Sequence, residues 1–138
     1  MNTVSKILTR KSPHTNYITS SSSVLKAVRA MKQKNRSYLI VRSKGKYEGI
    51  VTERNCLYNL ILKERDARTT LVTEIMTIDL PVVGLDDTAE QCMLIINSTK
   101  SRHLSVLDEG KFKGIITIHD LMSEALAEHE LNHHWYVD

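Results

Sequence analysis

The sequence has few cysteines, few aromatic residues and no long apolar run, and each shortage argues against a class of protein. Of the 138 residues, two are cysteines and 5% are aromatic. Cys56 and Cys92 lie among helical apolar positions and form no Cys-x-x-Cys pair, which predicts buried thiols in a reducing compartment rather than a disulfide or metal site. No apolar run approaches the roughly 20 residues that span a membrane, and the first residues lack the apolar core of a secretory signal. We therefore expect a cytoplasmic protein without a membrane segment.

The charges are unevenly distributed between the two halves of the chain. Residues 1–68 hold 15 Lys and Arg against 4 acids (+11), and residues 69–138 hold 4 against 12 (−8), which together give the net charge of +3. Such asymmetry is compatible with nucleic-acid binding or with electrostatic pairing between halves. Because the basic residues are scattered and few aromatics lie among them, solvated surface is the favoured interpretation.

One short segment occurs twice, 65 residues apart: Gly49 to Asn55 (GIVTERN) and Gly114 to Asp120 (GIITIHD). Each copy predicts an apolar strand that passes through a threonine into a helix, with a polar residue at the N3 position of a capping box. The start of a helix offers unpaired N–H groups to a phosphate, and Asp120 is suited to accept hydrogen bonds from sugar hydroxyls. A single copy would be interpreted as a helix cap only, whereas two copies favour a duplicated binding unit.

The remaining pattern repeats in the same order, which predicts an α/β (α+β) protein of two tandem β-α-β-β-α units. Apolar spacing predicts helices over 23–34, 52–63 and 118–127 and strands over 37–42, 47–51, 102–107 and 112–116. A further helix is predicted to open at Asp86-Asp87-Thr88, with Ala89, Cys92, Met93 and Ile96 on its inner face. The predicted inner faces include Leu57, Leu60, Ile61, Val28, Met93, Met122, Ala125 and Leu126, and Asp87 with Glu90 is a predicted capping box. We expect repeats at 1–65 and 72–127, a linker at 66–71 and a tail at 128–138 that extends the last helix. Units this small should share a core.

Several motifs together resemble a known family. They are Val-Thr-Glu-Ile-Met-Thr (72–77), Asp-Asp-Thr (86–88), Arg-His-Leu-Ser-Val (102–106) and the two Gly-h-h-Thr-x-x-Asp/Asn segments, where h is apolar. Over residues 3–127 the chain resembles a CBS-domain pair, the cystathionine-β-synthase domain tandem or Bateman module. The resemblance implies two repeats packed with pseudo-two-fold symmetry, and we expect a stand-alone module.

The resemblance also implies a regulatory module that binds an adenosine nucleotide (AMP, ADP, ATP or NAD(H)) and acts by ligand-dependent conformational change. Phosphate and ribose contacts are implied for Thr117 with Asp120 and for Thr52 with Asn55. The implied adenine walls are Ile18 and Thr19 in the first repeat and Val82 and Val83 in the second. Positions implied near phosphates are Arg102, His103, Ser37, Tyr38 and Arg54. A homodimer and an unidentified target protein are the expected partners, with no membrane or nucleic acid.

The chain departs from the family pattern in its first repeat. Asn55 stands where an aspartate is usual, and a neutral amide lacks the anionic acceptors of a carboxylate. Tyr38 places a large ring where many members have a small residue. We therefore expect the Asp120 site to bind more tightly and the Asn55 site to be weak or empty.

Other interpretations remain open at this point. His103, His119 and Asp120 could form an acid–base set, but no nucleophile with a partnered base accompanies them, so we expect no enzyme and no catalytic cofactor. His129 and His133, with Glu130 and His134 nearby, have a spacing compatible with a metal, yet no third fixed ligand is evident and we expect none. The +11 half lacks a nucleic-acid-binding signature. An interaction module with vestigial nucleotide clefts is the alternative function.

Overall fold

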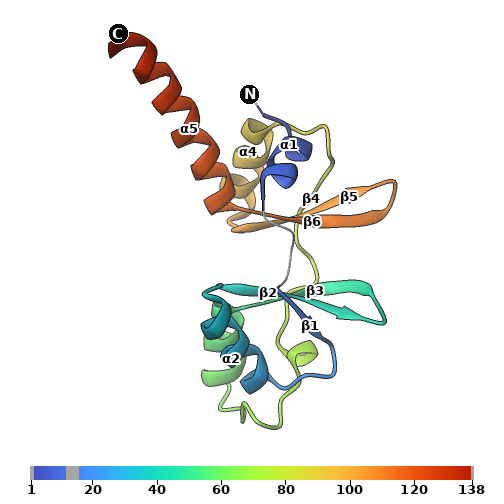
Figure 1. The fold of residues 1–138 in the computed structure, drawn as a ribbon. Coiled ribbons are helices and arrows are strands. Elements are labelled where there is room, and N and C mark those ends of the chain that lie inside the picture. Colours follow the sequence, from blue (N-terminus) through green and yellow to red (C-terminus); the bar gives the residue numbers. More distant parts are fainter. Residues whose placement is uncertain (1, 12–15, 138) are drawn as a thin grey trace. The chain divides into compact units, whose positions relative to one another are not determined.

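The chain folds into two compact units, each made of one sheet covered by helices (Figure 1). The computed structural model describes residues 2–11 and 16–137, with side chains described as far as residue 129. The central unit comprises residues 14–79, and the terminal unit comprises residues 1–13 with 80–138.

The central unit contains a three-stranded sheet in the order β1-β2-β3. β1 is parallel to β2, and β2 is antiparallel to β3. The elements are β1 (Tyr17–Thr19), α2 (Val24–Lys34), β2 (Tyr38–Ser43), β3 (Lys46–Thr52), α3 (Glu53–Asn55), a π-helical segment (Cys56–Ile61) and a 3₁₀ turn (Val72–Glu74).

The terminal unit repeats this arrangement with a sheet in the order β4-β5-β6. Its helices α1 and α4 and the start of α5 lie on one side of that sheet (Figure 1). The elements are α1 (Val4–Arg10), β4 (Val82–Val83), α4 (Ala89–Thr99), β5 (His103–Asp108), β6 (Lys111–Thr117) and α5 (Ile118–Val137).

The two hairpins have the same register, which confirms the duplicated fold. Tyr38 pairs with Thr52 as His103 pairs with Thr117, and in both hairpins the register shifts after the valine that faces the glycine of the repeated segment. Both turns also place two residues at positive φ, Lys44-Gly45 (50° and 77°) and Glu109-Gly110 (50° and 78°). That backbone matches the twist of the strands it joins.

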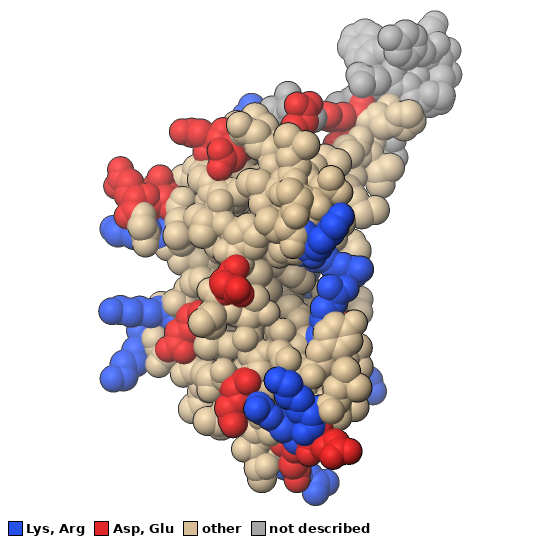
Figure 2. Space-filling view, turned by 180° about the vertical axis from the view of Figure 1, so that it is seen from behind, with Lys and Arg blue, Asp and Glu red and all other residues tan. Residues whose placement is uncertain are grey.

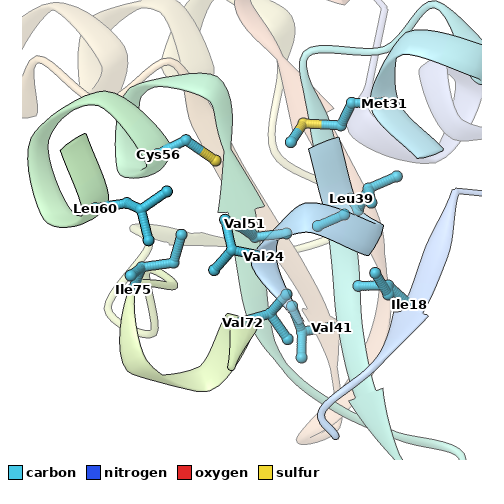
Figure 3. Packing of buried hydrophobic residues seen from close by; sticks show 11 residues of the cluster. Ile18, Val24, Met31, Leu39, Val41, Val51, Cys56, Leu60, Val72 and Ile75 are labelled. Atoms are coloured by element: carbon cyan, nitrogen blue, oxygen red, sulfur yellow. The ribbon is translucent and has the colours of Figure 1, made fainter. Parts of the chain in front are cut away.

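The compact units differ from the sequence repeats because the leading segments are exchanged. Val72 and Ile75, which open the second repeat, pack in the core of the central unit with Val24, Val41 and Leu60 (Figure 3). Val4 and Ile7, which open the first repeat, pack in the core of the terminal unit. Backbone bonds fix both segments: Val72 N–H donates to Ser22 C=O (2.9 Å) and Val4 N–H to Asp87 C=O (2.8 Å).

One predicted helix cap is wrong by one residue. α4 begins after Thr88, whose hydroxyl accepts from Gln91 N–H (3.2 Å) while the Gln91 side chain accepts from Thr88 N–H (2.8 Å). The predicted pair, Asp87 with Glu90, does not form this box. Asp87 instead accepts from Gly84 N–H (2.7 Å) and fixes the turn before the helix.

The predicted inner faces of the helices are partly wrong. In the π-helical segment Cys56 and Leu60 are buried, whereas Leu57 and Ile61 are 52% and 61% exposed, because only one narrow face of this short helix meets the core. In α5, Leu121 and Glu124 take the inner positions, and Met122 and Leu126 are exposed. The exposed large apolar side chains on helices are Val28, Leu57, Tyr58, Ile61, Met93, Leu94, Met122 and Leu126, and Ala125 is also exposed.

α5 reaches Val137, so the tail extends the last helix, as the sequence predicted. No helix in the described part of the chain combines the length and hydropathy needed to cross a bilayer.

Candidate functional site

The start of α5 has the predicted capping box. Thr117 Oγ1 accepts from Asp120 N–H (3.1 Å), and Asp120 Oδ2 accepts from Thr117 N–H (2.8 Å). The box fixes the first turn of a 20-residue helix, whose N-terminus carries a partial positive charge. An anion is therefore favoured at this end of the helix.

Lys11 contributes a cation to this site, and sequence reasoning missed it. Its ammonium lies 2.8 Å from Asp120 Oδ2 and also donates to the Ile115 carbonyl (2.8 Å). The side chains of Lys11 and Asp120 are 17% and 18% exposed. The two residues are separated by 109 positions, so no local sequence signal could have indicated the contact.

His103 lies close enough to Arg102, Lys11 and Asp120 for their charges to act on its imidazole, and the role of Arg102 and His103 near a phosphate stays a prediction. The pKa of His103 is lowered to about 4, mainly by burial and then by the positive charges of Arg102 and Lys11, against a smaller opposing effect of Asp120. The imidazole is therefore neutral near pH 7. Arg102 is exposed and orients the start of α5 through its carbonyl, which accepts from Ile118 N–H (3.0 Å). The fixed positive charges of the cluster are Lys11 and Arg102.

The corresponding helix start in the central unit carries different side chains. Thr52 and Asn55 form the predicted capping box at 3.0 Å in both directions. The Asn55 amide also donates through Nδ2 to Thr77 Oγ1 (3.0 Å). Both ends of this amide are thus engaged within the unit. Tyr38 is buried and Arg54 is exposed, and the Ser37 carbonyl accepts from Glu53 N–H (3.0 Å).

The four residues expected to wall an adenine divide into two kinds. The side chains of Ile18 and Val83 belong to the hydrophobic cores of their units, whereas Thr19 and Val82 are exposed. Strand register aligns Val82 with Tyr17 rather than with Thr19, because Val82 pairs with Ser105 as Tyr17 pairs with Ile40. The Tyr17 ring contacts the Arg42 guanidinium at 4.0 Å.

The structure gives no added support to the metal or nucleic-acid interpretations. Among the residues whose side chains are described, no three His, Cys, Asp or Glu gather as a metal site. Glu130, His133 and His134 lie outside those residues. On the face shown in Figure 2, both basic (Lys, Arg) and acidic (Asp, Glu) side chains occur among uncharged surface.

Comparison with known proteins matches the CBS domain model to residues 4–62 and 72–127. A protein with CBS domains from Burkholderia ambifaria is 34% identical, with 91% of this chain and 95% of that chain covered and a TM-score of 0.84. A hexameric CBS-CP12 protein from bloom-forming cyanobacteria is 28% identical, with 88% and 70% covered and a TM-score of 0.72. The mitochondrial CBS domain-containing protein CBSX3 of Arabidopsis thaliana is 27% identical over 118 residues, which are 82% of this chain and 57% of that protein. The chain thus spans little more than half of that curated relative.

Proposed function

Since this chain belongs to the CBS domain family, we propose that it is a regulatory module that binds an adenosine nucleotide through its terminal unit. A pair of CBS domains is in general a regulatory or binding module, and these matches indicate no catalytic family. The observation that carries the proposal is the capping box of Thr117 and Asp120, with Lys11, Arg102 and His103 around it. The proposed ligands are AMP, ADP, ATP or NAD(H).

In this proposal the start of α5 binds the phosphate and Asp120 binds the ribose. The helix terminus and the Arg102 guanidinium supply positive charge, and the neutral imidazole of His103 supplies a hydrogen-bonding edge. Asp120 uses Oδ2 for Thr117 and Lys11, and Oδ1 accepts no hydrogen bond from any described residue. A ribose diol can therefore donate to a carboxylate that the capping box already holds in place, which limits the entropy lost on binding.

The same reasoning makes the Asn55 site the weaker one. Its amide is neutral, and Nδ2 is already bonded to Thr77, so a ribose hydroxyl would have to compete with an internal partner. The buried ring of Tyr38 occupies the position that His103 has in the terminal unit.

Regulation requires that the ligand favours one arrangement of the protein over another, because a ligand with equal affinity for both shifts nothing. We propose that this signal passes to a partner protein through a homodimer. The exposed apolar side chains of α4 and α5, Met93, Leu94, Met122 and Leu126, support an interface of that kind. The CBS-CP12 relative is a hexamer, so a solution mass other than that of two chains would contradict the dimer.

The proposed compartment is a reducing one, such as the cytoplasm. Cys56 and Cys92 are buried, unpaired and lie in different units, as is usual where thiols stay reduced. The Arabidopsis relative is mitochondrial.

The test is ligand binding by the wild type and by two isosteric variants. Thermal shift with AMP, ADP, ATP, NAD, NADH and S-adenosylmethionine identifies the ligand, because a molecule that binds only the folded state raises the melting temperature. Calorimetry then measures its affinity. Asp120→Asn keeps a cap acceptor but removes the charge, and should weaken binding about tenfold or more, since hydrogen bonds to charged groups contribute about 1.5–3 kcal/mol. Asn55→Asp is the matched control and should change the affinity less than about threefold.

Two outcomes would contradict the proposal. Wild-type protein that responds to none of the six molecules would leave an interaction module whose sites are vestigial. An Asp120→Asn variant with unchanged affinity would mean that the nucleotide binds elsewhere.

A further inference from the structure

Two consecutive basic residues tie the end of α1 to the first turns of α5. Arg10 bonds Glu124 (2.8 Å), and Lys11 bonds Asp120 (2.8 Å). Asp120 and Glu124 are four residues apart, so the two acids lie on one face of the helix. The pairs connect segments that are more than 100 residues apart in sequence.

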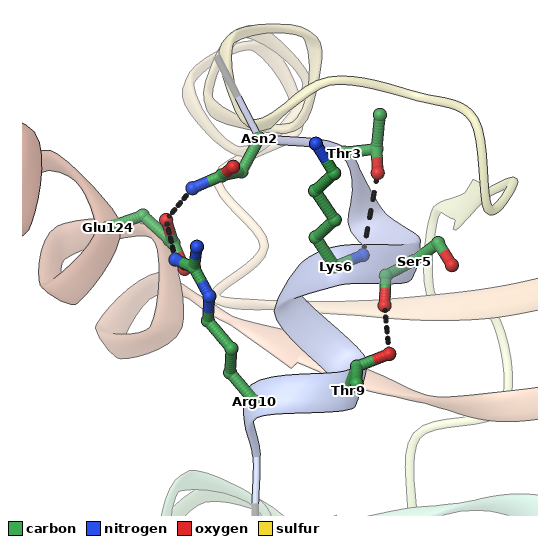
Figure 4. Close-up of polar contacts among 7 residues, drawn as sticks. All are labelled: Asn2, Thr3, Ser5, Lys6, Thr9, Arg10 and Glu124. Atoms are coloured by element: carbon green, nitrogen blue, oxygen red, sulfur yellow. Dashed lines mark hydrogen bonds and ion pairs between the residues drawn. The ribbon is translucent and has the colours of Figure 1, made fainter.

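The two pairs differ in how many oxygens of the carboxylate accept hydrogen bonds. Glu124 is buried, and both its oxygens are taken by Arg10 and Asn2 (Figure 4). This is the pattern of a structural anchor. Asp120 has one oxygen engaged and lies at the helix start, where the proposed ligand binds.

Lys11 is in an electrostatically unfavourable position for a purely structural residue. A cation near the N-terminus of a helix opposes the helix dipole, whereas an anion there is stabilised. Asp120, together with the Ile115 carbonyl, compensates that cost only as long as it stays paired with Lys11. A ligand phosphate at the same end of the helix would be a second and stronger compensating charge, and an ammonium on a flexible four-carbon chain can reach it.

We propose that Lys11 selects phosphorylated ligands at this site by exchanging its pairing partner. Without a ligand it holds Asp120. When ribose hydroxyls bind Asp120, Lys11 turns to the ligand phosphate. The inference rests on the proposed function and adds to it a specificity-determining residue: Lys11, in the N-terminal segment, discriminates a nucleoside phosphate from the bare nucleoside.

The exchange has opposite consequences for charged and uncharged ligands. A ribose diol that uses Asp120 Oδ1 for one hydroxyl brings its second hydroxyl into competition with Lys11 for Oδ2. A nucleoside that lacks a phosphate therefore weakens the Lys11 pair and supplies no new partner for the ammonium. A nucleotide displaces Lys11 and supplies a new partner. Removal of the ammonium should therefore weaken AMP binding and leave adenosine binding equal or tighter.

Calorimetric titration of AMP and adenosine into four proteins tests this inference. In Lys11→Met, which keeps the chain length and removes the charge, the affinity for AMP should fall about tenfold, and the affinity for adenosine should be unchanged or higher. Lys11→Arg keeps the charge and should retain AMP binding to within about threefold. Arg10→Met removes the neighbouring anchor and should alter both affinities equally. Melting temperatures of all variants check that each is folded.

The results separate this inference from the proposed function. If the wild type binds AMP and Lys11→Met leaves the ratio of the two affinities unchanged, or weakens both ligands equally, the selecting role of Lys11 is wrong and the nucleotide site stands. If the wild type binds neither AMP nor adenosine, the nucleotide site and the role of Lys11 are both wrong.

Discussion

Replacement of Gly49 by alanine should destabilise the central unit, although it adds one methyl group. Gly49 lies in β3, next to the bridge in which Ile50 N–H donates to Thr77 C=O (3.0 Å) and Thr77 N–H to Ile50 C=O (2.8 Å). A Cβ at Gly49 would approach the Thr77 carbonyl oxygen to well under 3.0 Å and Ile78 Cγ2 to 3.3 Å. The first contact is with backbone, so no side-chain rotation relieves it.

The expected loss in the free energy of unfolding depends on the backbone that Gly49→Ala must displace. Overpacking in a well-packed site costs about 1–3 kcal/mol, and loss of the two bridge hydrogen bonds costs about 0.5–1.5 kcal/mol each. The lower chain entropy of alanine in the unfolded state offsets about 0.4–1 kcal/mol. Because the displaced strand absorbs part of the overlap, we expect a net loss of about 2–4 kcal/mol. With a urea m-value near 2 kcal/mol/M, the midpoint should fall by about 1–2 M.

Urea unfolding followed by circular dichroism measures this loss, and Gly84→Ala provides the matched control. A Cβ at Gly84 meets only Asp87 Oδ2 at 3.8 Å, an ordinary contact, so that variant should be as stable as the wild type or slightly more stable. If the midpoint of Gly49→Ala lies within 0.3 M (about 0.6 kcal/mol) of that of Gly84→Ala, the close approach of Thr77 to β3 is wrong. Thr77 also accepts a hydrogen bond from the Asn55 amide, so a displacement of Thr77 in Gly49→Ala should weaken that hydrogen bond too.

Two further predictions concern titrating groups. Burial, together with the charge of Asp87, raises the pKa of Cys92 to about 11, so its thiol should resist iodoacetamide at pH 8 and react after unfolding in urea; rapid labelling of the folded protein would contradict its burial. The pKa of His103 is lowered from 6.5 to about 4, so between these pH values the unfolded chain binds more protons and the free energy of unfolding should fall as the pH falls. His103→Gln should make that dependence shallower by up to about one proton, and an unchanged slope would mean that His103 titrates normally in the folded state.

The elements and the duplication could be predicted from sequence because their determinants are local. The 65-residue spacing of the repeated segment and of Gly45 and Gly110 matches two hairpins with identical register. Thr52 and Thr117 were correctly identified as caps, since a cap and its partner are only three residues apart. Apolar periodicity located α2, α4 and α5 but not the short helix α1. It also overestimated the inner faces of the helices, as Leu57 and Met122 demonstrate, because periodicity cannot tell how wide a face the sheet covers.

The order of capping, strand and turn signals along the chain was enough to determine two similar α/β halves, each with a helix that starts at a threonine cap. Only the tertiary structure decided which segments pack together. Val4 and Val72 carry the same apolar pattern, yet each completes a core built mainly from the other sequence repeat, and Lys11 meets Asp120 across 109 residues. Burial and charge pairing act through space, so a pattern along the chain specifies that a residue needs a partner without specifying which one.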